Sequence, residues 1–167
     1  MKGRFSLLLA LEQTIAVGCA TVIGTWFGHL IHMPLAFISG LWCAIATIIV
    51  LQVEMKESFK QAWIRVVGSC VGSIITFIIA SIFGYRFWSF LISIYATVVF
   101  VSLINFKQTL RIASLTVAVI MITGMAHPNI APGLNSLSRL TESIIGIMIA
   151  IFFVWVFLPL HKRIGPG

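Results

Sequence analysis

Apolar residues form six long runs along the chain, and short polar or charged segments separate these runs. A helix rises about 1.5 Å per residue, so about 20 consecutive apolar residues cross the hydrocarbon core of a membrane. The pattern therefore predicts an all-α, polytopic membrane protein with six transmembrane helices. The predicted spans are residues 6–31, 34–53, 62–84, 87–106, 108–126 and 139–160, followed by a tail at 161–167.

The breaks between the runs have local physical causes. Proline disfavours helical backbone in the residue before it, so Met33-Pro34 is predicted to end the first helix. The segment "VEMKESFKQ" carries four charges, and "HPNIAPGLNS" has two Pro, two Asn and one Gly, so both are predicted to be loops. The fifth helix is predicted to be the weakest span, because its uncharged part is only "IASLTVAVIMITGMA".

Composition supports the membrane assignment. The chain is 60% hydrophobic and 9% charged, with a mean hydropathy of +1.11, whereas about a quarter of the residues of a soluble domain are charged. The net charge of +7 does not indicate nucleic-acid binding, because the basic residues lie between apolar runs and form no cluster. Cys19, Cys43 and Cys70 lie inside apolar runs without metal-binding spacing, so we interpret them as small buried residues.

The basic residues predict the direction of the chain in the membrane. Nine of the eleven Lys and Arg flank one set of predicted helix ends, and only Arg86 and Arg139 lie on the other side. Cytoplasmic loops carry an excess of Lys and Arg, so both termini are predicted to be cytoplasmic. The nine are Lys2, Arg4, Lys56, Lys60, Arg65, Lys107, Arg111, Lys162 and Arg163.

The sequence also contains a weak internal repeat. An offset of 74 residues aligns two triplets, Arg65, Ser69 and Gly72 with Arg139, Ser143 and Gly146. Each triplet opens the third predicted helix of one half, and three spans per half require the two halves to be inverted in the membrane. A 3+3 inverted repeat is typical of transporters and channels, whose substrate path lies between the repeats.

The repeated triplets are candidate pathway residues, because positions i, i+4 and i+7 share one face of a helix. Arg65 is then expected at the cytoplasmic mouth of a path, and Arg139 at its outer mouth. Each residue also has a structural interpretation. Glycines at this spacing let helices pack closely, as Gly24 and Gly28 also would. Arg65 can extend to the interface as a topology charge, and Arg139 can pair with Glu142 one turn later.

Glu12 and Glu142 are candidate proton-coupling residues. Acidic residues inside membrane helices are costly and commonly functional, and the chain contains no Asp that could serve instead. For Glu12, an interfacial ion pair with a nearby Lys or Arg is the alternative.

The remaining chemistry-bearing residues form no familiar site. His29, His32 and His127 map to the predicted outer side, but their spacing is too weak to predict a metal. The sequence has no P-loop, dinucleotide fingerprint, nucleophile elbow or HExxH motif, so neither a cofactor nor enzymatic activity is predicted.

Two stretches resemble the fusaric acid resistance and aromatic acid exporter (FUSC-type) membrane proteins. "LWCAIATIIVLQVEMKESFKQAWIRVVGSCVGSIIT" resembles their second-to-third helix region, with matches at Gln52, Ser58, Arg65, Gly68, Ser69 and Gly72. "RLTESIIGIMIAIFFVWVFLP" resembles their sixth helix, which ends at a proline, with matches at Arg139, Glu142, Gly146 and Pro159. Distant similarity to plant aluminium-activated malate transporters, which are dimeric anion channels, is also expected.

The resemblance implies export of aromatic and other organic acids across a bacterial cytoplasmic membrane. Many members carry a cytoplasmic domain after the six helices, whereas this sequence ends at "HKRIGPG", as a short stand-alone member or a fragment would. A unit of this size is expected to form a homo-oligomer, a dimer or larger. The main hypothesis is thus a transporter or channel for organic anions. The alternative is a structural membrane subunit that docks a soluble or envelope-assembly partner through the loop Glu54–Gln61.

Overall fold

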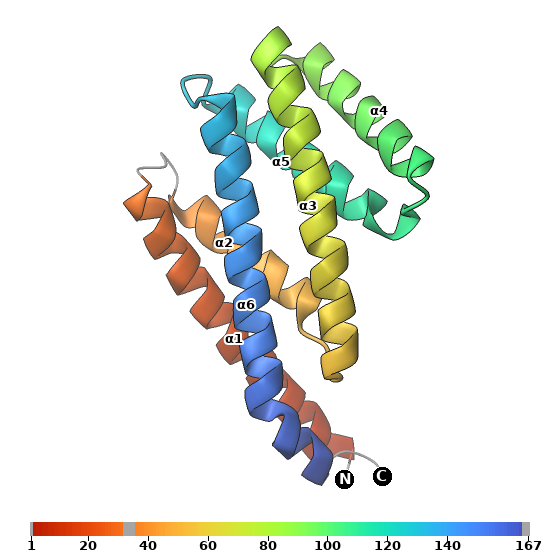
Figure 1. Ribbon diagram of the computed structural model, residues 1–167. Helices are drawn as coiled ribbons and strands as arrows, with labels where there is room; N and C mark the ends of the chain where they lie inside the picture. Colours follow the sequence, from red (N-terminus) through yellow and green to blue (C-terminus); the bar gives the residue numbers. More distant parts are fainter. Residues whose placement is uncertain (1, 32–35, 165–167) are drawn as a thin grey trace. The chain divides into compact units, whose positions relative to one another are not determined.

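The computed structural model describes residues 2–31 and 36–164, all of whose regular structure is helical (Figure 1). Apolar sequence and internally bonded backbone together make helices the stable form in lipid. The elements are α1 (Lys2–Leu30), α2 (Ala36–Val50), α3 (Met55–Phe83), α4 (Phe87–Leu103), the short 3₁₀ helix η1 (Lys107–Thr109), α5 (Leu110–Ala126) and α6 (Pro132–Ile164).

The six predicted helices are confirmed, with different lengths than expected. Four segments are long and apolar enough to cross a membrane, namely Leu7–Leu30, Met55–Phe83, Lys107–Ala126 and Pro132–His161. The apolar helices α2 and α4 are shorter, at 15 and 17 residues. The 3₁₀ helix η1 runs directly into α5, and together they form the shortest of these four segments, at 20 residues. Within η1, the hydroxyl of Thr109 donates a hydrogen bond to the carbonyl oxygen of Phe106 at 2.9 Å.

Two predicted loops are partly helical. Helix α3 begins at Met55 and takes in most of "VEMKESFKQ". Glu57 lies in its first turn, where a negative charge is favourable, and pairs with exposed Lys60 at 3.6 Å. Helix α6 begins at Pro132, inside the predicted loop "HPNIAPGLNS". Proline is tolerated there because the first backbone N–H groups of a helix have no partner within the helix.

The expected end of the sixth helix at Pro159 was also wrong. Helix α6 continues to Ile164 with Pro159 inside it. Membrane helices tolerate an internal proline when neighbouring groups satisfy the freed carbonyl. The other predicted proline break, Met33-Pro34, lies outside the described residues, as does His32.

The chain divides into two compact units. The terminal unit comprises Met1–Trp63 and Glu142–Gly167, and the central unit comprises Ile64–Thr141. The terminal unit therefore contains α1, α2 and most of α6, while the central unit contains most of α3 together with α4 and α5. Each unit combines two helices from one predicted half with the third helix of the other half.

Glycines hold the helices of the terminal unit close together. A Cβ atom at Gly24 would lie 2.6 Å from Sγ of Cys43, and one at Gly28 would lie 2.8 Å from Cα of Ala36. These distances confirm the packing interpretation of the Gly24 and Gly28 pair, which faces α2. Helix α6 also approaches α2 closely, because a Cβ at Gly146 of α6 would lie 2.5 Å from the carbonyl oxygen of Cys43.

The central unit repeats this contact between α3 and α5. A Cβ at Gly72 would lie 2.5 Å from the carbonyl oxygen of Ala113, and one at Gly68 would lie 2.8 Å from Cβ of Ile112. Gly72 and Gly146 are 74 residues apart, which is the offset of the predicted repeat. In the terminal unit, Gly146 of α6 thus packs against the backbone of α2. In the central unit, Gly72 of α3 packs against the backbone of α5 in the same way.

Asn135 fastens the start of α6 within the central unit. Its side-chain Nδ2 group donates hydrogen bonds to the carbonyl oxygen of Ile120 at 2.9 Å and to the hydroxyl of Tyr85 at 3.2 Å. The ring of Tyr85 lies directly over Gly124, with no room there for a side chain. Burial raises the pKa of Tyr85, and the bond from Asn135 partly opposes that rise. Because the net change in the pKa is a rise, the hydroxyl of Tyr85 stays protonated and neutral at physiological pH.

Replacing Asn135 by Ala should therefore destabilise the protein by about 1–2 kcal/mol, because the buried carbonyl of Ile120 loses its side-chain donor. Thermal unfolding in detergent would measure the change. Asn129→Ala is the matched control, since Asn129 is exposed in the preceding loop. Equal melting temperatures for the two variants would contradict a fastening role for Asn135.

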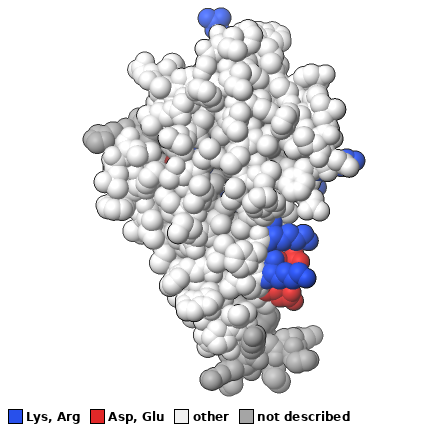
Figure 2. All heavy atoms as spheres, in the orientation of Figure 1, with Lys and Arg blue, Asp and Glu red and all other residues white. Residues whose placement is uncertain are grey.

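The surface is compatible with lipid. On the face shown in Figure 2, charged side chains of the described residues appear at only a few places. Large apolar side chains such as Trp26, Trp88 and Trp155 are more than half exposed. Exposed apolar area of this extent is unfavourable in water and favourable in a bilayer.

Candidate functional site

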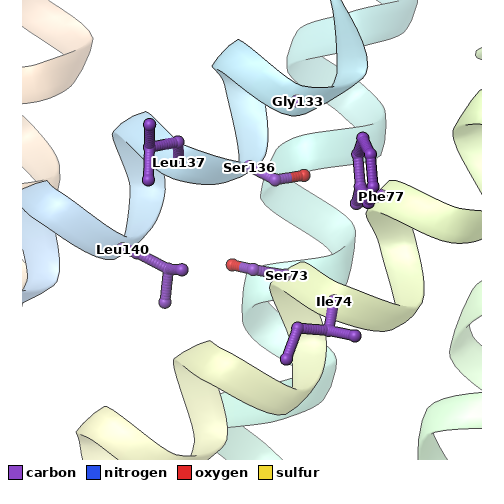
Figure 3. Close-up of a pocket in the computed structure, with 7 residues that line it drawn as sticks. All are labelled: Ser73, Ile74, Phe77, Gly133, Ser136, Leu137 and Leu140. Carbon is purple, nitrogen blue, oxygen red and sulfur yellow. The ribbon is translucent and has the colours of Figure 1, made fainter.

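The central unit contains a cavity of about 420 Å³ beside helices α3 and α6 that is open to the surface, and Ile74, Phe77 and Leu137 in its wall are exposed (Figure 3). This volume is in the usual range for small-molecule sites. The lining is almost entirely apolar, apart from two serine hydroxyls. The residues that line it are Ser73, Ile74 and Phe77 of α3, and Gly133, Ser136, Leu137 and Leu140 of α6. We call it the Ser73–Ser136 cavity.

The two serines give this cavity its only side-chain hydrogen-bonding groups. Their hydroxyl groups point from α3 and α6 into the space between the two helices (Figure 3). Both are buried, and neither has a hydrogen-bond partner among the residues that the structure describes. A buried hydroxyl without a partner costs about 1–3 kcal/mol, and a bound polar group would recover that energy. The wall of the cavity is thus apolar, and the two serine hydroxyls beside it expose almost no area to it.

The two predicted arginines belong to the same unit as the cavity. Arg65 is 3% exposed and Arg139 is 5% exposed. Ser73 lies eight residues after Arg65, and Ser136 lies three residues before Arg139, so each pair shares a helix face. The rise between Arg65 and Ser73 is about 12 Å, and that between Ser136 and Arg139 is about 4.5 Å. Neither arginine lines the cavity itself, as both lie along the helix from it.

Charge is distributed unequally between the two units. The central unit contains no acidic residue, and all four glutamates, Glu12, Glu54, Glu57 and Glu142, belong to the terminal unit. The central unit has five cationic side chains, Arg65, Arg86, Lys107, Arg111 and Arg139. The boundary between the units falls just before Glu142, which lies three residues after Arg139 on α6 and offsets part of this positive charge.

The other predicted pathway residues are placed differently. Ser69 is buried on α3 between Arg65 and Ser73, on the same face as both. Ser143 and Gly146 of α6 belong to the terminal unit, where the carbonyl of Gly146 lies 3.0 Å from the hydroxyl of Thr47. The contacts of Gly72 and Gly146 are those of close helix packing. Their role in a substrate path stays a prediction.

The predicted proton-coupling residues lie in the terminal unit. Glu12 of α1 is 0% exposed, and its Oε2 atom lies 2.9 Å from Nε2 of His161 on α6. The contact that the structure describes for Glu12 is thus a buried one with histidine, and the expected interfacial ion pair with Lys or Arg stays a prediction. Glu142 is also buried, and its carbonyl oxygen accepts a hydrogen bond from the Cys43 thiol at 3.4 Å.

Gln52 and Ser58, two residues of the sequence motif, form hydrogen bonds that join the end of α2 to the first turn of α3. The backbone N–H of Gln52 donates to Oγ of Ser58 at 3.1 Å, and that hydroxyl lies 3.3 Å from the Gln52 carbonyl, to which it donates. This reciprocal pair satisfies backbone groups at the end of α2. Gln52 and Ser58 therefore have a structural role that explains their place in the motif.

Sequence reasoning missed three features of the site. Ser73 continues the Arg65 and Ser69 spacing by another turn, so an extended periodicity search would have found it. Ser136 lies in a segment that was predicted to be a loop, which hid its helical relation to Arg139. His161 was assigned to the tail, and no spacing in the sequence connects it to Glu12.

Comparison with known proteins gives one match. A family model described as fusaric acid resistance protein-like matches residues 10–153. No curated protein and no solved structure matches the chain. Similarity to the aluminium-activated malate transporters stays a prediction. The match covers most of the sequence, including the helices that carry both arginines and the cavity. The chain is therefore a multi-pass membrane protein of the fusaric acid resistance protein-like family, which indicates a transporter-type function.

Proposed function

We propose that the protein conducts organic anions, including aromatic carboxylates, outward across a bacterial cytoplasmic membrane. The observation that carries this proposal is the Ser73–Ser136 cavity, which lies on the same helices as two buried arginines. It belongs to a unit with five cationic and no acidic side chains. An apolar cavity with hydroxyl donors in a positive potential suits a molecule with an apolar body and an anionic end.

The apolar body and the anionic end of such a substrate would each interact with side chains of the central unit. The ring of Phe77 and the side chains of Leu137 and Leu140 offer apolar surface to an aromatic ring. The hydroxyls of Ser73 and Ser136 can donate hydrogen bonds to a carboxylate. Arg65 and Arg139 raise the local concentration of anions and lower the cost of moving a negative charge through lipid.

The arrangement in the membrane follows from the charges. The excess of Lys and Arg at one set of helix ends supports cytoplasmic termini. This direction places Arg65 toward the cytoplasm and Arg139 toward the outside. The function needs no catalytic step, and we propose a homo-oligomer, a dimer or larger, as its working form.

Flux into liposomes tests the function. Terephthalate is a suitable probe, because it is aromatic and both its carboxylates are ionised near neutral pH, so little crosses the lipid uncharged. Liposomes containing the full chain should take up terephthalate faster than protein-free liposomes, and faster than they take up succinate. They should exclude the aromatic cation benzyltrimethylammonium. Equal uptake of cation and anion, or no uptake above that of protein-free liposomes, would contradict anion transport.

The double variant Ser73→Ala and Ser136→Ala should raise the KM for terephthalate at least about 100-fold, because each of the two lost hydrogen bonds to a charged group contributes about 1.5–3 kcal/mol. Its melting temperature should not fall, since both hydroxyls lack hydrogen-bond partners among the described residues. Ser102→Ala, at an exposed position of α4, is the matched control. An unchanged KM in the double variant would remove the cavity from the pathway.

The alternative function, docking of a partner, depends on Glu54–Gln61. Most of this segment is the exposed first part of α3 and not a flexible loop. The flux assay separates the two functions, because a purely structural subunit would give no selective uptake of terephthalate.

A further inference from the structure

A second polar site lies in the terminal unit, apart from the Ser73–Ser136 cavity. We propose that Glu12 and His161 form a proton-binding site that couples proton movement to anion export. Its ligand is the proton. The coupling rests on the proposed function, while proton binding by the pair does not.

The geometry brings the two groups into direct contact. Oε2 of Glu12 lies 2.9 Å from Nε2 of His161, and the two side chains are 1% and 5% exposed. Glu12 lies on α1 within the candidate span Leu7–Leu30, and His161 ends the span Pro132–His161 of α6. The ring of Phe157 lies 6.5 Å from the imidazole ring, so an aromatic side chain covers one side of the pair.

Burial dictates how many protons the pair holds. A lone carboxylate in an apolar interior is costly, and so is a lone imidazolium. With one shared proton, the pair is neutral overall, whether the proton is on the carboxylate or on the imidazole. Removing that proton leaves one negative charge, and adding another leaves one positive charge. The coupled pair therefore favours the one-proton state, and exchanging a proton changes the buried charge by one unit.

The second carboxylate oxygen points to proton exchange. Both carboxylate oxygens of Glu12 are buried and make no hydrogen bond within the part of the chain that the structure describes, although Oε2 lies 2.9 Å from Nε2 of His161. A carboxylate fixed only for structural purposes would satisfy both oxygens, because an unsatisfied charged acceptor is costly. A proton or a water molecule arriving at Oε1 would remove this cost.

The other glutamates are placed differently, because Glu142 is buried like Glu12 but lies far from His161, whereas Glu54 and Glu57 are exposed. The four charged residues before and in the first turns of α3 are exposed, namely Glu54, Lys56, Glu57 and Lys60. Among them, Glu57 pairs with Lys60 at 3.6 Å. Glu142 lies more than five helical turns before His161 on α6, about 28 Å along the axis. The unit's remaining ionisable residues are Lys2, Arg4, Cys19, His29, His32, Cys43, Lys162 and Arg163.

The coupled cycle follows from the charge balance. One proton enters the pair from outside and leaves to the cytoplasm, while one organic anion moves outward. With the termini cytoplasmic, the pair lies toward the inner end of its helices and releases its proton there. The inward proton gradient then contributes to export of the anion.

Liposomes that contain a pH-sensitive dye test this coupling. A terephthalate gradient should change the internal pH in liposomes with wild-type protein. Glu12→Gln and His161→Gln should each reduce this proton movement at least about tenfold, because each removes one of the two groups that share the proton. Exchange of labelled for unlabelled terephthalate needs no net proton movement, so both variants should retain it. The exchanged pair, Glu12→His with His161→Glu, should restore coupling.

The controls separate this inference from the function itself. Exposed His29→Gln and Glu57→Gln should behave like the wild type. Terephthalate flux without proton movement in the wild type would overturn the coupling and leave the anion transporter standing. If the wild type shows no flux, infrared spectroscopy of the purified protein decides whether the pair binds protons. A pH-dependent carboxylic acid band that disappears in Glu12→Gln supports proton binding, and its absence overturns it.

Discussion

Replacing Arg139 by Gln, or Arg65 by Gln, should reduce terephthalate flux about 10- to 100-fold, because charge-assisted interactions contribute about 1.5–3 kcal/mol each. Both arginines are almost fully buried in a unit that contains no acidic residue. Electrostatic interactions there are stronger than at the surface, since little water screens them. Liposome flux with the anion-to-cation preference measured in parallel gives the result.

Two further variants make this test specific. Arg86→Gln removes a positive charge from an exposed position of the same unit and should change the flux little. Lysine at position 65 or 139 keeps the charge but loses the planar, bidentate guanidinium, so it should restore part of the flux. If the Gln variants fold normally and conduct terephthalate at the wild-type rate, the arginines serve topology or packing only.

Replacing Gly146 by Val should destabilise the protein by about 3 kcal/mol, at the upper end of the usual cost of overpacking. A Cβ at this position would lie 2.5 Å from Cβ of Ala46 and 2.5 Å from the carbonyl oxygen of Cys43. The backbone of α2 cannot move aside like a flexible side chain. The inserted atoms would also separate Thr47 from the Gly146 carbonyl, which are 3.0 Å apart.

Gly18→Val is the control for this substitution, because nothing lies within 4 Å of a Cβ at Gly18. That variant should be within about 0.5 kcal/mol of the wild type, since valine is a slightly better helix former than glycine. Thermal unfolding in the same detergent compares the two. Equal stability of both variants would show that the α2 and α6 contact does not depend on a glycine.

The sequence by itself determined the properties that depend on local composition and spacing. Runs of apolar residues specify helices in lipid regardless of which helices become neighbours, so all six were predictable. The periodicity of 3.6 residues placed Arg65, Ser69 and Gly72 on one face, and all three are buried. Helix ends were less predictable, because Pro132 is compatible with both a loop and a first helical turn.

The tertiary structure alone decided which of these faces meet. Gly72 packs on α5 and Gly146 on α2, a pairing across the two predicted halves that no local pattern contains. Ser73 and Ser136 line one cavity, and Glu12 meets His161 from the opposite end of the sequence. Which residues of distant segments come into contact depends on how those segments are placed relative to one another. That placement results from the packing of many side chains. Spacing along one helix constrains only the residues of that helix.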